Sequence, residues 1–138
     1  MKLIASLALI IAACAPPVLA HDDGHGGQIT PEELAWYANL KQPDNPSMSC
    51  CGLADAYYAD SFKAHPSGNY VAIITDTRED TQFGRPHVPP GTEVIVPNTK
   101  LKYDQGNPTE HNIIFMSRLP SKDTNQPSVY CYVVPGGV

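Results

Sequence analysis

One short segment near the start of this chain, from Thr30 to Leu40, has hydrophobic and polar residues at helical spacing. Thr30 is suited to cap a helix, Pro31 fits the first helical position, and Glu33 completes a capping box. Apolar residues follow at helical spacing as far as Leu40, and Pro43 ends the segment. The pattern predicts one short N-terminal helix that needs packing against the rest of the domain.

The rest of the pattern is typical of short strands. Val71 to Ile74 are continuously apolar, as expected of a central strand, and Pro66, Ser67 and Gly68 predict a hairpin turn before it. The 14 prolines and 10 glycines also favour short elements. We therefore expect a mainly β fold, either a small five-stranded, partly open barrel or a bent antiparallel sheet. The expected strands cover residues 56–63, 69–76, 93–96, 112–116 and 129–134.

The first 20 residues have the pattern of a signal peptide. Lys2 gives the positive start, residues 3–13 are apolar, and Ala20 is a small residue at the expected cleavage site. Cleavage there would leave residues 21–29 as a flexible His/Asp/Gly tail, followed by one domain over residues 30–138. In the alternative interpretation, residues 11–14 are a lipoprotein box and Cys14 anchors the chain through a lipid. Both interpretations predict a periplasmic or secreted protein in an oxidising compartment.

Three cysteines, an odd number, remain after the leader is removed: Cys50, Cys51 and Cys131. At least one thiol is then free, intermolecular or metal-bound. In the last expected strand Cys131 shares a face with Val129 and Val133, so we expect it to point into the core. We expect a disulfide from Cys131 to either Cys50 or Cys51. The remaining cysteine offers a route to a disulfide-linked dimer.

Two motifs around these cysteines carry a family resemblance. Residues 49–52 read Ser-Cys-Cys-Gly and are followed by an Ala-Asp pair, and residues 129–132 read Val-Tyr-Cys-Tyr. The chain resembles a group of small secreted proteobacterial proteins of unknown function, which have a Cys-Cys pair and a C-terminal Tyr-Cys-aromatic motif. Ala56 stands where these proteins carry the cysteine of an Asp-Cys pair. The resemblance implies a secreted, disulfide-stapled domain and no particular activity.

The loop after the expected central strand gathers charges of both signs. Asp76, Arg85 and His87 are candidate binding residues there, with Arg85 contacting an anionic group and His87 acting as a base or ligand. In the competing interpretation the loop is solvated and its charges pair with one another.

Histidines of the expected tail are candidate metal ligands. After cleavage at Ala20, the amine and the ring of His21 are placed to chelate one metal together, and His25 adds a second imidazole. Nitrogen ligands of this kind suit copper(II). In the competing interpretation the tail is only a solvated linker.

Charge and motif content narrow the class of function. The net charge of −5 argues against a nucleic-acid binder, and outside the leader there is no apolar run long enough for a transmembrane span. We find neither a nucleophile elbow with a Ser/His/Asp order nor a phosphate-binding glycine loop. We therefore expect a non-catalytic binding or structural domain without a cofactor, with an unidentified ligand or protein partner. The alternatives are an envelope copper-binding protein and, third, an enzyme with its site near Asp76, Arg85 and His87.

Overall fold

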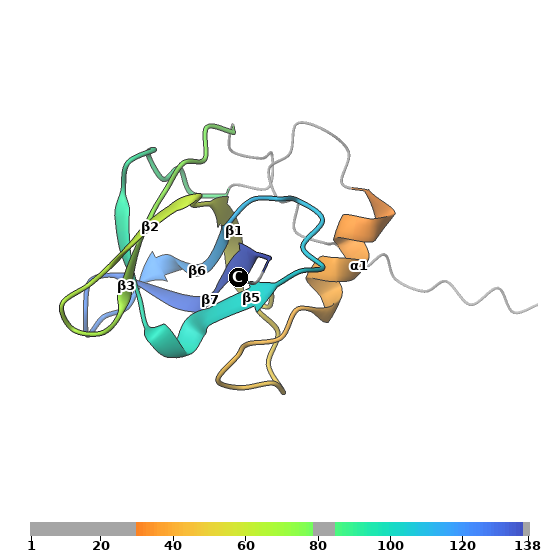
Figure 1. Cartoon of the computed structure of the whole chain (residues 1–138). Helices are drawn as coiled ribbons and strands as arrows, with labels where there is room; N and C mark the ends of the chain where they lie inside the picture. Colours follow the sequence, from red (N-terminus) through yellow and green to blue (C-terminus); the bar gives the residue numbers. More distant parts are fainter. Residues whose placement is uncertain (1–29, 79–84, 137–138) are drawn as a thin grey trace, which may run out of the picture.

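The computed structural model describes residues 30–78 and 85–136 and shows a mainly β domain with one α-helix (Figure 1). The expected mainly β class is confirmed. The elements, in chain order, are α1 (Pro31–Asn39), β1 (Ala54–Tyr58), β2 (Ser61–Ala64), β3 (Tyr70–Ile73), β4 (Glu93–Val96), a short 3-10 helix η1 (Asn98–Lys100), β5 (Leu101–Asp104), β6 (Ile113–Pro120) and β7 (Pro127–Pro135).

Seven strands form two sheets in the described part of the chain. The four-stranded sheet has the order β1-β6-β7-β5, and the three-stranded sheet has the order β2-β3-β4. Neighbouring strands are antiparallel except β5 and β7, which run parallel. The expectation of five strands in one antiparallel sheet or partly open barrel was therefore wrong in its detail. The central position predicted for residues 71–74 is confirmed for β3.

The segment 56–63, expected as one strand, is divided between the two sheets. Its first half belongs to β1 and its second half to β2. At the break, the backbone N–H of Ala59 donates to the carbonyl of Asn112, while that of Asp60 donates to the hydroxyl of Thr75. The strand β5 was missed because it has only four residues and follows directly on η1.

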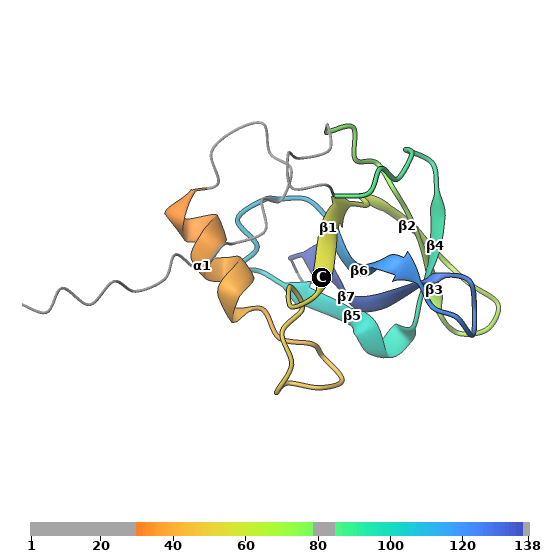
Figure 2. The same cartoon turned by 180° about the vertical axis from the view of Figure 1, so that it is seen from behind.

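Two hydrophobic clusters lie on opposite faces of the four-stranded sheet. The first fills the space between the sheets and includes Ile74, Val96 and Tyr132. The second lies between the four-stranded sheet and α1 and includes Tyr37 and Phe115. Figures 1 and 2 accordingly place α1 and the β2-β3-β4 sheet on opposite sides of the four-stranded sheet.

A β-bulge in β7 changes the expected faces of that strand. Phe115 pairs with Cys131 and Met116 pairs with Val129, so Tyr130 is the extra residue on β7. Cys131 and Val133 share the second cluster, as expected, but Val129 belongs to the first cluster. The prediction that all three share one face was wrong, because an extra residue reverses the side-chain alternation.

The N-terminal helix begins as predicted. The hydroxyl of Thr30 accepts from the backbone N–H of Glu33 at 3.1 Å, and the Glu33 carboxylate accepts from the N–H of Thr30 at 2.8 Å. This confirms the capping box. None of the helices in the described ranges is both long and apolar enough to span a membrane.

Candidate functional site

Asp76 lies at the centre of a buried ion cluster at the end of the three-stranded sheet. Arg85 donates through Nη1 to Oδ2 of Asp76 at 2.9 Å. Arg78 donates through Nε to Oδ1 at 2.9 Å and through Nη2 to Oδ2 at 2.6 Å. Only 3% of Asp76 and 5% of Arg85 are exposed. Two of the three binding residues predicted from the sequence therefore contact each other, and a ligand-binding role for them stays a prediction.

The same cluster holds strand β1. The backbone N–H of Tyr58 donates to Oδ2 of Asp76 at 3.1 Å. The guanidinium carbon of Arg78 lies 3.6 Å from the centroid of the Tyr58 ring, and that of Arg85 lies 4.7 Å from the Tyr57 ring. Both contacts have the geometry of cation–π interactions.

The charge of Asp76 is maintained by its arginine partners. Burial raises the pKa of this carboxyl, but the hydrogen bonds and charge of Arg78, together with the hydrogen bond from Arg85, lower the pKa by more. The pKa of Asp76 therefore lies below its ordinary value. At neutral pH the cluster contains a carboxylate between two guanidinium groups.

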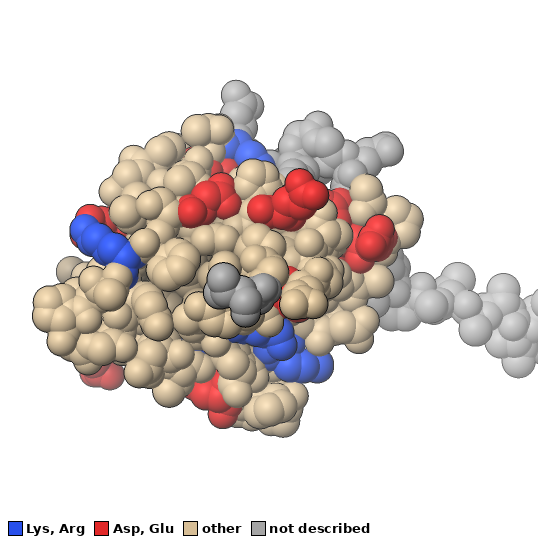
Figure 3. Space-filling view, viewed as in Figure 1, with Lys and Arg blue, Asp and Glu red and all other residues tan. Residues whose placement is uncertain are grey.

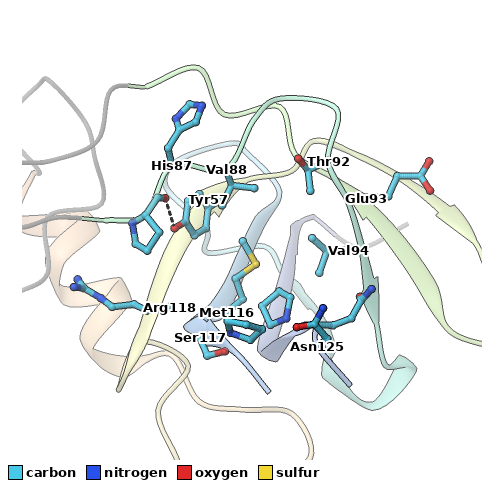
Figure 4. A pocket seen from close by; sticks show the side chains of 14 residues that line it. Tyr57, His87, Val88, Thr92, Glu93, Val94, Met116, Ser117, Arg118 and Asn125 are labelled. Carbon is cyan, nitrogen blue, oxygen red and sulfur yellow. Dashed lines mark hydrogen bonds between the residues drawn. The ribbon is translucent and has the colours of Figure 1, made fainter. Parts of the chain in front are cut away.

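A pocket of about 350 Å³ opens next to this cluster, between β1, β4, β6 and the loop that precedes β4 (Figure 4). This volume is at the lower end of the range for small-molecule sites. Val94 and Met116, each 3% exposed, and Val88 point into the space between the strands. His87 is at the rim and its ring points away from Met116. Of the predicted binding residues, His87 is therefore the one that lines the pocket.

Arg118 also lines the pocket and was missed by sequence reasoning. Its Nη2 donates to Oδ1 of Asp55 at 3.1 Å, and its Nε lies 2.9 Å from Oδ2. The two residues are 63 positions apart, and they meet because β1 and β6 are neighbours in the sheet. Their proximity depends on the pairing register, and no local sequence signal marks it.

A second missed pair lies outside the pocket. Nδ1 of His111 is 2.9 Å from Oδ2 of Asp60, and the His111 ring stacks on Tyr58 with centroids 4.0 Å apart. Glu110, directly before the histidine, has a φ of 60°, in the left-handed region. The stacking and the carboxylate together fix the orientation of the His111 ring. Because Asp60 is 51 positions away in the sequence, only the fold brings the pair together.

Of the cysteines in the part of the chain that the structure describes, Cys50 and Cys131 form a disulfide across 81 positions. Both belong to the cluster under α1. Cys51 is free, and its thiol donates to the carbonyl of Tyr37 at 3.3 Å. Burial raises the pKa of Cys51 to about 12, so at neutral pH almost none of it is thiolate. A dimer linked through Cys51 stays a prediction, and this environment disfavours it.

The predicted metal ligands His21 and His25 lie outside the described residues, as does Cys14. Within 30–78 and 85–136, no three His, Cys, Asp or Glu side chains are grouped to hold a metal ion. The face in Figure 3 carries acidic and basic side chains surrounded by uncharged surface.

No known protein family, curated protein or solved structure matches this chain. The sequence patterns and the geometry of the pocket and the ion cluster are therefore the observations that bear on function.

Proposed function

We propose that this chain is a secreted or periplasmic, non-catalytic binding domain whose ligand occupies the pocket beside Tyr57. The pocket itself is the observation that supports the proposal, since it combines apolar walls from two sheets with a polar rim. Sites for small ligands have this composition. The location is supported by the signal-peptide pattern and is consistent with the Cys50–Cys131 disulfide.

In this proposal the ion cluster around Asp76 holds the pocket loop in place and does not itself bind the ligand. Arg85 directly precedes the loop that lines the pocket, and its Nη1 also donates to the carbonyl of Ala56 in β1 at 3.0 Å. The start of the loop is thereby attached to a strand of the opposite sheet. Such an attachment favours a pocket that is largely formed before the ligand arrives.

The proposal is tested by measuring how far small compounds stabilise the wild type, a pocket variant and a matched control variant. Val88→Trp fills the pocket, whereas Ile95→Trp adds the same side chain at a position that is 44% exposed and does not line the pocket. In a thermal unfolding screen of small aromatic and aliphatic compounds, we expect stabilisation of the wild type and of Ile95→Trp. Val88→Trp should lose that stabilisation. A screen in which the three proteins respond equally would contradict the proposal.

A second proposal is an envelope copper-binding protein that uses His21 and His25. It is supported by the sequence alone, because a terminal amine and an imidazole on one residue form a chelate ring. Copper(II) is titrated into protein that begins at His21 and into a variant with one extra N-terminal residue. The extra residue should weaken binding sharply, and acidification below about pH 6 should weaken it as protons compete. Equal affinities of the two proteins would show that the tail is only a linker.

A further inference from the structure

The hydroxyl groups that line the pocket already donate within the protein. Those of Tyr57, Thr92 and Ser117 each donate to a backbone carbonyl, at 2.8, 2.6 and 2.7 Å respectively. A hydroxyl has a single proton to donate. A ligand with a strong acceptor would therefore gain no hydrogen bond from these three groups without breaking an existing one.

The oppositely charged side chains on the wall are balanced by partners. Arg118 is held by the carboxylate of Asp55, and Glu93 accepts a hydrogen bond from Nζ of Lys63 at 2.6 Å. Each pair places a positive and a negative charge next to each other at the edge of the pocket. In Figure 4 the charged ends of Arg118 and Glu93 point away from the centre, in opposite directions.

The centre of the pocket is apolar. Val88, Val94 and Met116 converge there, and the ring of Tyr57 closes one side (Figure 4). The amide of Asn125, at the lower rim, supplies one neutral donor and acceptor. An ion placed in this space would lose its water shell, and Arg118 and Glu93 already have partners of opposite charge, so its burial is unfavourable.

We infer that the ligand of this pocket is a neutral, largely apolar small molecule. The inference rests on the proposed function and adds the chemical class of the ligand. Affinity comes mainly from apolar area of the ligand that is removed from water, because Val94 and Met116 are each only 3% exposed before it binds. The hydroxyl protons are already donated and the charges are paired, which selects against a ligand that carries a fixed anionic group.

Two fluorescent probes that share an aromatic skeleton test the charge preference. N-phenylnaphthylamine is neutral, whereas anilinonaphthalene sulfonate carries an anionic group on the same skeleton. We expect one molecule of the neutral probe to bind per chain, about tenfold or more tightly than the sulfonate. Ile95→Trp should keep this binding and Val88→Trp should lose it. If Val88→Trp fails to show a cooperative unfolding transition, Thr92→Trp replaces it, because Thr92 also lines the pocket.

The outcomes separate the inference from the proposed function. If the sulfonate binds as tightly as the neutral probe and both are lost in Val88→Trp, the pocket binds ligands but the inferred neutrality is overturned. If neither probe binds, the inference is also overturned. The thermal unfolding screen of small compounds then tests the proposed function separately. If Val88→Trp binds the neutral probe as well as the wild type does, the pocket is not the binding site and the proposed function fails too.

Discussion

The carboxylate of Asp76 links β1 to the segment that connects β3 with β4. It accepts from the backbone of Tyr58 in β1 and from the side chains of Arg78 and Arg85. Tyr58 lies in β1, whereas both arginines belong to the segment between β3 and β4. Removing the carboxylate would leave two guanidinium groups without their buried counter-ion, and such a loss is costly in a site that excludes water.

We expect Asp76→Asn to destabilise the protein by about 3–5 kcal/mol at neutral pH. The pKa of Asp76 is lowered in the folded state, so the stability that this residue contributes is present above its ordinary pKa of about 3.9. It is lost as the pH falls through the lower, folded-state pKa. Urea unfolding over a pH series should therefore show a large difference in the free energy of unfolding between the wild type and Asp76→Asn at pH 7. This difference should become smaller below about pH 4.

The control for this prediction is Asp44→Asn. Asp44 forms an ion pair with Lys100 at 2.7 Å, but its side chain is 33% exposed. Pairs at the surface contribute at most about 1 kcal/mol, so this variant should stay close to the wild type. A loss of less than 1 kcal/mol in Asp76→Asn would mean that the cluster tolerates an amide and does not hold the loop.

Cys51 should react slowly with alkylating reagents in the folded protein. Its pKa is raised to about 12 by burial, and the thiolate is the reactive form. With the disulfide intact, we expect iodoacetamide at pH 8 to label Cys51 at least about a hundredfold faster in urea than in buffer. Equal rates would show an accessible thiol. Disulfide-linked dimers on a non-reducing gel would support the dimer predicted from the odd cysteine count.

At the scale of elements, local signals were sufficient for α1 and for the turn between β2 and β3. The capping box and the turn at Gly68, which has a φ of 83°, involve residues within five positions of one another. Contacts between residues far apart in the sequence could not be predicted from the sequence pattern. The parallel β5–β7 pair, the bulge at Tyr130 and the Asp55–Arg118 contact in the pocket wall all depend on which strands become neighbours.

The disulfide connects two elements that the chain separates widely. It ties the segment before β1 to β7, and both cysteines pack in the cluster beneath α1. We expect the double variant Cys50→Ala/Cys131→Ala to lose about 2–5 kcal/mol of stability, because a long loop is released in the unfolded state. Denaturant unfolding with and without reductant measures the effect.

Cys51→Ala is the matched control, because it removes a neighbouring sulfur that is not part of the bridge. It should change stability much less than the double variant. Comparable losses in the two proteins would mean that packing of sulfur atoms under α1, and not the covalent link, stabilises this cluster.

At the scale of the whole molecule, the two sheets are held to each other at one end by an ion cluster, and the pocket opens beside it. The apolar cluster between the sheets includes Val94 and Met116, which are also the apolar wall of the pocket. The pocket is thus an opening of the core. This arrangement explains why core-type side chains line it.

Processing of the leader determines the N-terminus and the mass of the mature chain. If the leader is cleaved after Ala20, protein expressed with its leader in a bacterial host and recovered from the periplasm begins at His21. Its intact mass should equal that of residues 21–138 less two hydrogens, since one disulfide forms between Cys50 and Cys131. Reduction should restore the two hydrogens, and alkylation after unfolding should then label three thiols. A heavier species that carries a lipid at Cys14 would contradict cleavage at Ala20. It would also remove the free amine of His21 on which the copper proposal depends, while leaving the pocket and its neutral ligand untouched.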